Sequence, residues 1–386
     1  MILLIFIIIV FFHGLIHLLG FLKEFDLAKI DELSGKTLIP LSEHYAKIAG
    51  VFWFISCILF MASLLLLLMK KEWWWMLGVA AVFISQLLII VYWQDAKFGT
   101  ITNIIVFGGI LIAFGSWNFK NDIKDDLKSF TPADSRKKEI ISHHMLFDLP
   151  YPVQKWLQRS QIIGKNKINT VHLFQSGSMK IKPEGSWIPV RAEQYFTVDT
   201  PGFLWIADVK ASPFIPMVGK DKYLAGNGHM EIKALSLIPV VNSRGKEIDQ
   251  GTMVRFLAEM IWFPSAALNN YITWEEIDDY QAKAIFTYGD ISASGIFIFN
   301  EEGDVVGFEA QRYYNRKEGA TLETWYINID PDSIQEFEGI KIPVRSEVTW
   351  KFKEGDFTWY KLEISNVEYN KNINFFPESS GDLVLH

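Results

Sequence analysis

Four long apolar stretches in the first third of the chain restrict its fold more than any other feature. They are Ile2–Leu22, Ile48–Met69, Trp73–Trp93 and Ile101–Trp117. Each is about as long as the roughly 17–25 residues that a bilayer-spanning helix needs. A backbone inside lipid must satisfy its own hydrogen bonds, so such stretches fold as helices. The sequence therefore predicts a membrane α-helical bundle of four transmembrane helices over residues 1–117.

The ends of these stretches carry the residues that anchor helices at a membrane surface. Tryptophan and tyrosine cluster there, for example at Trp73–Trp75 and at Trp117. No small-residue cleavage site follows the first stretch, so we interpret it as a retained helix and not as a signal peptide. Lysine and arginine are more frequent on the side that holds both termini, which favours cytoplasmic termini in a bacterial inner membrane. The first stretch alone favours the opposite orientation, because its nearby positive charges follow it.

Two histidines lie inside the first stretch, where ionisable residues are expensive and often functional. His13 and His17 are four residues apart and share one face of a helix. One interpretation is a metal site, a haem site or a proton relay. The other is a pair of neutral imidazoles that form hydrogen bonds across the bundle, to Ser85 or Gln86. We favour the second, because no other stretch contains a histidine.

The connection between the third and fourth stretches is short and polar. It reads QDAKFGTITN over Gln94–Asn103, and we expect Asp95 and Lys97 on the same side of the membrane as His17. These residues form either a polar pocket at the mouth of the bundle or a solvated turn. The predicted polar site of the membrane region consists of His13, His17, Asp95 and Lys97.

Residues 118–138 are predicted to connect the membrane to the soluble region. Apolar residues recur there at helical spacing, flanked by lysines: Phe119, Ile123, Leu127 and Phe130. This pattern predicts either an amphipathic helix in the headgroup plane or a direct continuation of the fourth span. Thr131–Arg136, with the sequence TPADSR, breaks the pattern and is the expected linker.

Residues 139–386 are predicted to form an α+β domain built on an antiparallel sheet. One amphipathic helix is expected, over 251–263, where the sequence MVRFLAEMIWFP places apolar residues at helical spacing. Many strands without intervening helices imply antiparallel neighbours, so we expect a curved sheet, or half-barrel, packed around that helix. The predicted strands are Thr170–Ile181, Trp187–Val198, Phe203–Ala211, Met230–Leu237, Ala282–Thr287, Gly295–Phe299, Val305–Tyr314, Leu322–Ile329, Lys341–Phe352 and Phe357–Val367.

The soluble region is rich in large aromatic residues, which either fill a core or line an apolar ligand site. We predict that it binds a lipid or another apolar small molecule beside the bilayer. Two arginines, Arg312 and Arg345, lie in strand-like runs, where they would contact an anionic head group or pair with acidic residues. The predicted ligand-binding residues are Phe256, Leu257, Met260, Trp262, Trp205, Arg255, Glu259, Arg312 and Tyr314.

Two other functions stay open at this point. A metal- or haem-dependent enzyme would use His13 and His17, or His229 and Glu231, which lie two residues apart in a strand pattern. A packed protein-interaction module would have no cavity. The sequence contains no nucleophile elbow, P-loop, Rossmann glycine pattern or zinc-protease histidine pair, so we predict no catalytic residue and no metal or other cofactor. A net charge of −7 argues against a nucleic-acid partner, and no protein partner is predicted.

Several motifs resemble those of an uncharacterised family of bacterial membrane proteins with a domain of unknown function. They include HGLIHLLGF (His13–Phe21), WQDAKFGTITN (Trp93–Asn103), GNGHM (Gly226–Met230) and, most specifically, RFLAE-x-x-WFP (Arg255–Pro264). The resemblance supplies no activity. In layout, the soluble half also resembles the lipoprotein-carrier fold, in which a curved antiparallel sheet and a helix enclose an acyl-chain cavity.

Overall fold

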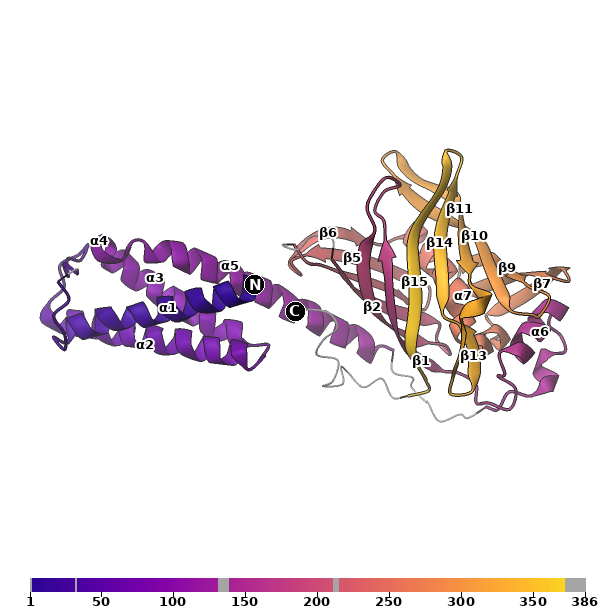
Figure 1. Cartoon of the computed structure of the whole chain (residues 1–386), viewed down its shortest axis with the longest axis horizontal. Helices are drawn as coiled ribbons and strands as arrows, with labels where there is room; N and C mark the ends of the chain where they lie inside the picture. The colour runs from indigo at the N-terminus through magenta and orange to yellow at the C-terminus, as the bar shows by residue number, and fades with distance from the viewer. Residues whose placement is uncertain (1, 32, 131–138, 211–214, 372–386) are drawn as a thin grey trace. The chain divides into compact units, whose positions relative to one another are not determined.

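A computed structural model describes residues 2–31, 33–130, 139–210 and 215–371. The chain forms two compact units, Met1–Asn121 and Asp122–His386 (Figure 1). The first unit is helical, and the second is built on a large β-sheet. We describe each unit separately.

The helical unit contains four helices that are long and apolar enough to cross a membrane. This confirms the four predicted long apolar helices. A short helix precedes the fourth of them. The helices are α1 (Ile2–Glu24), α2 (Glu43–Leu68), α3 (Trp74–Val91), α4 (Trp93–Ala96) and α5 (Gly99–Lys128).

Helix α5 is longer than the fourth apolar stretch. It continues without a break through Lys128, so the amphipathic residues from Phe119 onward belong to the same helix as the fourth span. Within the second unit, Asp126 of α5 accepts hydrogen bonds from Lys220 (2.7 Å) and Lys222 (2.8 Å) of the sheet. The linker predicted at Thr131–Arg136 lies outside the described residues.

The sheet of the second unit has thirteen strands, and every paired neighbour is antiparallel. The spatial order is β6-β5-β4-β3-β2-β1-β15-β14-β11-β10-β9-β8-β7. Strands β1 and β15, the first and last in the sequence, are therefore paired in the middle of the sheet. We call strands β1 to β6 the first arm. The second arm consists of β15, β14, β11, β10, β9, β8 and β7. The strands are β1 (Thr170–Met179), β2 (Ile188–Thr197), β3 (Gly202–Val209), β4 (Met217–Leu224), β5 (Asn227–Ala234), β6 (Ile238–Ser243), β7 (Ile272–Asp278), β8 (Gln281–Tyr288), β9 (Ile291–Phe299), β10 (Val305–Arg316), β11 (Gly319–Ile329), β14 (Arg345–Phe352) and β15 (Gly355–Tyr369).

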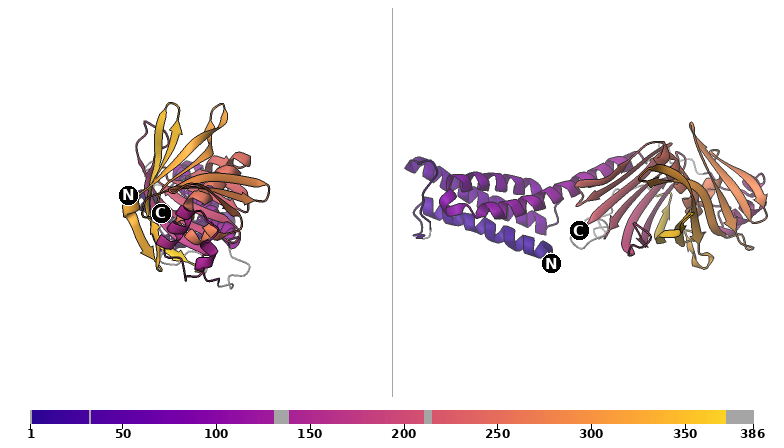
Figure 2. Two further views of the ribbon diagram at one scale, coloured as in Figure 1. Left: turned by 90° about the vertical axis from the view of Figure 1, so that its right-hand side faces the viewer. Right: turned by 90° about the horizontal axis from the view of Figure 1, so that it is seen from above.

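The two outer edges of the sheet, β6 and β7, are consecutive in the sequence. The chain crosses from one edge to the other through α7 (Lys246–Glu259) and two 3-10 turns, η2 (Met260–Trp262) and η3 (Pro264–Leu268). Helix α7 contacts β4 and β5 of the first arm and β8, β9 and β10 of the second. The arms curve around it (Figures 1 and 2). The predicted fold class, a curved antiparallel sheet around a central helix, is therefore confirmed.

Smaller elements complete the β-domain. A two-stranded sheet, separate from the large one, joins two short strands, and the remaining helices are one α-helix and two 3-10 turns. They are β12 (Ile334–Phe337), β13 (Ile340–Pro343), α6 (Tyr151–Arg159), η1 (His143–Leu146) and η4 (Pro331–Ser333).

The central helix differs from its prediction at both ends. It begins at Lys246, five residues before the predicted 251, because Gly245 adopts a φ of +113° and allows the chain to enter the helix there. Regular α-helix ends at Glu259, and η2 continues the turn to Trp262. The apolar stripe is placed as predicted: its residues are buried and pack against both arms, namely Met253, Phe256, Leu257, Met260 and Ile261.

A glycine of β5 allows α7 to lie close to the sheet. A Cβ atom added at Gly228 would stand 2.5 Å from Thr252 Oγ1 and 2.8 Å from the backbone oxygen of Ile248. The Gly228 amide donates to Asp249 Oδ1 at 2.6 Å, which fixes the first turn of α7 on β5. Both neighbours belong to the helix, so a side chain at this position would displace α7.

We expect Gly228→Ala to lower the free energy of unfolding of the β-domain by roughly 1–3 kcal/mol, the usual cost of overpacking a tight contact. Urea unfolding of the full-length protein, followed by tryptophan fluorescence, would measure the change. Asn227→Ala, at the exposed neighbouring position, is the matched control and should change the free energy by less than about 0.5 kcal/mol. Equal effects of the two substitutions would contradict the close approach.

Candidate functional site

The β-domain contains a cavity of about 160 Å³ between α7 and the concave face of the sheet. Strands of both arms line it, together with α7 and η2. The predicted ligand-binding residues at this cavity are Trp205, Arg255, Glu259, Trp262 and Arg312. The structure thus brings together five of the nine predicted residues, from β3, α7, η2 and β10.

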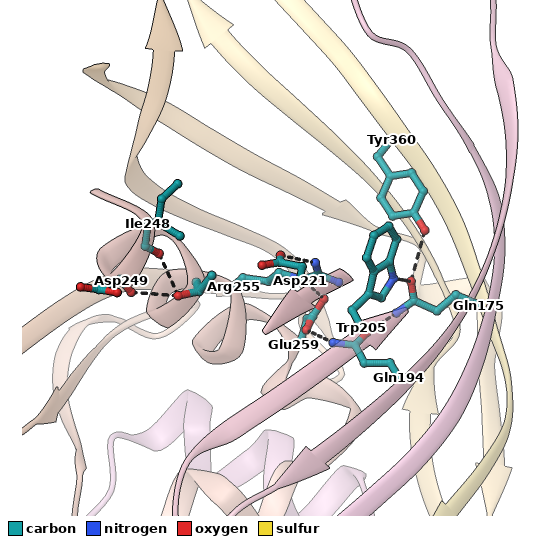
Figure 3. Close-up of polar contacts among 10 residues, drawn as sticks. Gln175, Gln194, Trp205, Asp221, Ile248, Asp249, Arg255, Glu259 and Tyr360 are labelled. Atoms are coloured by element: carbon teal, nitrogen blue, oxygen red, sulfur yellow. Dashed lines mark hydrogen bonds and ion pairs between the residues drawn. The ribbon is translucent and has the colours of Figure 1, made fainter. Parts of the chain in front are cut away.

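A chain of buried polar contacts attaches α7 to the first arm (Figure 3). Arg255 donates through Nε to Glu259 Oε1 at 2.7 Å and through Nη1 to Asp221 Oδ2 at 2.8 Å. The other oxygen of Glu259 accepts from Gln194 Nε2 at 2.7 Å. The guanidinium also lies over the rings of Phe203 and Trp205, at 4.8 and 5.1 Å from their centroids.

The same chain of contacts continues through two glutamines into the middle of the sheet. Gln194 accepts from Gln175 Nε2 at 2.5 Å. The Gln175 oxygen then accepts from Trp205 Nε1 (3.0 Å) and from the Tyr360 hydroxyl (3.2 Å), which uses both of its lone pairs. Each contact along this path joins a donor to an acceptor, so the network fixes the wall of the cavity on the side of the first arm.

Burial and pairing act in opposite directions on the charges of this network. Burial alone would lower the pKa of Arg255, but the carboxylates of Glu259 and Asp221 outweigh it and raise the pKa above its ordinary value. Burial raises the pKa of Glu259, although Arg255 and Gln194 oppose the shift. Charged groups this deep are tolerated only when they are paired and hydrogen-bonded.

Arg312, in the second arm, has different surroundings. Its guanidinium lies 4.8 Å from the ring centroid of Trp325 and 5.9 Å from that of Trp350. Gly251 of α7 leaves room for it, since an added Cβ there would stand 3.2 Å from Arg312 Nε. Within the described residues, Arg312 has neither a hydrogen bond nor an ion pair. Burial lowers its pKa to about 10, so the group is still charged at neutral pH.

Unpaired polar atoms are concentrated at this cavity. Among the described residues, ten buried side-chain nitrogen or oxygen atoms lack a hydrogen-bond partner, and five of them belong to residues that line it. They are Asp221 Oδ1, Trp262 Nε1, Trp325 Nε1, Ser346 Oγ and Trp359 Nε1. Buried polar groups are normally satisfied, so these five atoms are the least satisfied polar groups in the wall of the cavity.

Four predicted ligand-binding residues lie elsewhere. Phe256, Leu257 and Met260 are fully buried in the core and do not line the cavity. Phe256 packs against Phe196, Tyr223, Phe263, Tyr271 and Phe286. Tyr314 packs against Trp350 and Phe352, away from the cavity lining. Helical periodicity identifies a buried face, but it does not separate core positions from cavity positions.

The His229–Glu231 pair does not form a site on the concave face. The two residues share one face of β5, as predicted, but the strand register places them beside Lys222 and Lys220, on the face opposite Asp221. His229 accepts from Arg244 at 3.1 Å and donates to Asn242 at 2.9 Å. Glu231 borders the cavity, but its carboxylate is paired with Lys233 at 3.2 Å.

Sequence reasoning missed Asp221, Gln175, Gln194 and Tyr360 as site residues. Gln194 carried a signal, because it is the one polar residue among the inward-facing positions of β2, which otherwise hold valine, alanine and phenylalanine. Asp221 lies on β4, a strand that the sequence did not reveal. Lysine and aspartate alternate in this segment, a pattern that is typical of a solvated turn. Only the pairing in the sheet shows which of these residues face inward.

The histidines of the membrane unit form a hydrogen-bonded cluster. His17 Nδ1 donates to the backbone oxygen of His13 at 2.6 Å, so its Nε2 accepts from Ser85 Oγ at 2.8 Å. His13 Nε2 donates to Asn103 Oδ1 at 2.8 Å, and the Asn103 amide donates to Gln86 at 3.0 Å. This is the predicted arrangement of imidazoles bonded across the bundle. No group of three or more histidine, cysteine or acidic residues in the described part of the chain is placed to hold a metal ion.

A second cavity, of about 310 Å³, lies within the helical unit beside this cluster. His13, His17 and Asp95 line it, together with Trp53 and other residues. Asp95 accepts from Ser34 Oγ and from the Gly35 amide, each at 2.8 Å. Lys97 does not line the cavity, and its ammonium group lies 5.3 Å from the ring centroid of Phe98. The predicted polar site is therefore assembled without Lys97.

We expect Glu259→Ala to lower the free energy of unfolding by about 3–5 kcal/mol, because it breaks a buried ion pair and leaves Arg255 Nε and Gln194 Nε2 without an acceptor. Urea unfolding of the full-length protein would measure the loss. Glu275→Ala is the control, since it removes an exposed ion pair with Lys283 (3.0 Å) and should cost no more than about 1 kcal/mol. Similar small losses for both would show that the buried network contributes little to stability.

One solved structure similar to this chain is that of a DUF1329 family protein from Desulfovibrio piger, with a TM-score of 0.34 and 10% sequence identity, over 60% of this chain and 99% of that one. A likeness at this level carries no argument about function. No curated protein matches the chain. The sequence model of DUF6920, described as a family of unknown function, matches residues 147–369. This match covers more than half of the chain, and the family has no assigned activity, so the uncharacterised family expected from the motifs is confirmed. The protein belongs to the DUF6920 family.

Proposed function

We propose that this protein binds a lipid or another apolar molecule in the cavity of its β-domain, while its four spans hold it in a bacterial inner membrane. The single observation that carries the proposal is the cavity itself. Its wall consists mainly of tryptophan, methionine, isoleucine, valine and leucine side chains, in a domain whose core is otherwise closely packed. Small-molecule sites are usually preformed and apolar, with a few polar groups that fix orientation.

The volume limits which part of a ligand would enter. A dry apolar cavity of about 150 Å³ binds benzene, whereas whole drug-sized ligands occupy roughly 300–1,000 Å³. At about 160 Å³, this cavity fits a segment of an acyl chain or a ring and not a complete lipid. Each methylene group that leaves water there would contribute about 0.8 kcal/mol to binding.

The buried polar network supports a rigid wall. Arg255, Glu259, Asp221, Gln194 and Gln175 tie α7 to β1, β2 and β4 at fixed positions. A wall that is already ordered loses little conformational entropy when a ligand binds, which favours affinity. In this proposal the network holds the wall of the cavity in place, and the apolar side chains contact the ligand.

We expect Gly219→Leu to reduce labelling of the cavity by a photoreactive probe by at least about tenfold, because the new side chain displaces several methylene groups at about 0.8 kcal/mol each. Gly219 lines the cavity, and an added Cβ would meet no atom closer than 3.6 Å, so the variant should fold. The full-length protein in phospholipid nanodiscs would be irradiated with a diazirine-bearing decanoic acid, and adducts located by peptide mass spectrometry.

Adducts on the four spans supply an internal control, because they should be equal in both proteins. Thr273→Leu adds a similar apolar side chain at an exposed position of β7 and should leave cavity labelling unchanged. The proposed function would be refuted if the cavity peptides of the unmodified protein were not labelled. It would also be refuted if Gly219→Leu left their labelling unchanged.

The orientation of the chain is also proposed. The excess of lysine and arginine on the side of both termini supports a cytoplasmic β-domain. In intact bacteria, we expect a membrane-impermeant maleimide to label Leu38→Cys, in the α1–α2 connection, but not Glu354→Cys, in the β14–β15 turn. Permeabilised cells should show labelling of both. The reverse pattern in intact cells would place the β-domain on the outer side.

A further inference from the structure

Among the unpartnered polar groups of the residues that line the β-domain cavity, hydrogen-bond donors outnumber acceptors. The unpartnered groups include three indole N–H donors, from Trp262, Trp325 and Trp359, and the hydroxyl of Ser346. An indole nitrogen can only donate. Against these, the unpartnered atom that can only accept is Asp221 Oδ1. This inventory covers the cavity residues that the structure describes, and the unpartnered groups in the wall are mostly donors.

Arg312 adds a positive charge to the same wall. It lines the cavity, and no carboxylate of the described residues forms an ion pair with it. The arginine on the opposite side, Arg255, is already bonded to Asp221 and Glu259. The guanidinium of Arg312 offers five donors in a planar fork, a geometry that matches a carboxylate.

The charges nearby limit the ligand to one negative charge. Asp221 and Glu259 border the same cavity, and both contribute to the electrostatic environment of Arg312. A second negative charge on the ligand would be repelled by these carboxylates, whereas a single one is offset by the guanidinium. A monoanion therefore fits better than a doubly charged phosphate.

We infer that the ligand of this cavity is an amphipathic carboxylic acid, with its carboxylate bound by Arg312 and its apolar part against the tryptophan-rich wall. The inference rests on the proposed function and adds the class of the ligand. Arg312 binds the head group directly, Trp325 supports the guanidinium from its face, and Gly251 leaves the room that the guanidinium occupies.

The test compares three competitors of the diazirine-bearing decanoic acid on the full-length protein in nanodiscs, at pH 8. Decanoate carries both a chain and a charge. Methyl decanoate carries the chain and acceptor oxygens without charge, and acetate carries the charge without the chain. We expect decanoate to reduce cavity labelling at a concentration at least about tenfold lower than methyl decanoate. Acetate should have no effect at that concentration.

The variant Arg312→Met separates the contribution of the charge. Decanoate should lose its advantage of at least about tenfold in this variant and compete no better than the ester. Cavity labelling of this variant would also be measured with a diazirine-bearing methyl ester. Methyl decanoate should compete with that probe equally well in the variant and in the unmodified protein, which would show that the cavity is intact. Arg345→Met is the control, because Arg345 is also a strand arginine but is paired with Asp330 at 2.8 Å and does not line this cavity.

The outcomes that would overturn the inference differ from those that would overturn the proposed function. Equal competition by acid and ester, or a preference for the acid that persists in Arg312→Met, would refute recognition of the carboxylate and leave the apolar site standing. Competition by acetate as strong as by decanoate would show a site for a free carboxylate and not for an amphipathic acid. Failure of both decanoate and its ester to compete would refute the proposed function itself.

Discussion

The position of the central helix depends on one buried guanidinium. Arg255 reaches from α7 to Asp221 of the first arm while it also binds Glu259 one turn along its own helix. Ions buried at this depth cost several kcal/mol each unless their partners are in place. Arg255 and Glu259 both belong to α7, so their bonds to Asp221 and Gln194 of the sheet restrict the depth and the rotation of the helix. The apolar stripe of the helix supplies most of the stabilisation, and the ion network selects a single arrangement.

That arrangement follows from how the sheet is connected. The sequence enters the sheet at β1, in the middle, and extends outward to the edge at β6. It then has to reach the opposite edge at β7, and the shortest route crosses the concave face. The crossing segment is α7, so its apolar side faces the sheet on both flanks. The outer strand β6 contains Pro239, a residue that sheets accept at edges, where its missing N–H breaks no ladder. The cavity is the part of the concave face that the helix does not fill.

The features that could be predicted from the sequence are those with a strong period or a strong composition. Four apolar stretches identified four spans, and the alternation around Val190–Phe196 identified a strand with its inner face. Three strands of the large sheet were missed, β4, β6 and β7, because charged or proline residues interrupt their alternation, and the short β12 was missed as well. The predicted strand Lys341–Phe352 is two strands that separate at Val344. In the site, Arg255 and Glu259 were found because their four-residue spacing is local. Asp221 and Gln175 were not found, because their partners are 34 and 19 residues away or more, and only the register of the sheet brings them together.

The pairing of β1 with β15 has a consequence for how the domain forms during synthesis. The inner edge of β1 cannot be paired along its whole length until the ribosome has made the chain as far as Tyr369, nearly two hundred residues after Val171, its partner in the ladder. Contacts this distant in sequence form slowly, because loop closure has to precede the gain from pairing. An open strand edge is also a template for association with other chains. The first arm is therefore synthesised long before the inner edge of β1 is paired. The four apolar helices that precede it in the chain are available for membrane insertion during that interval.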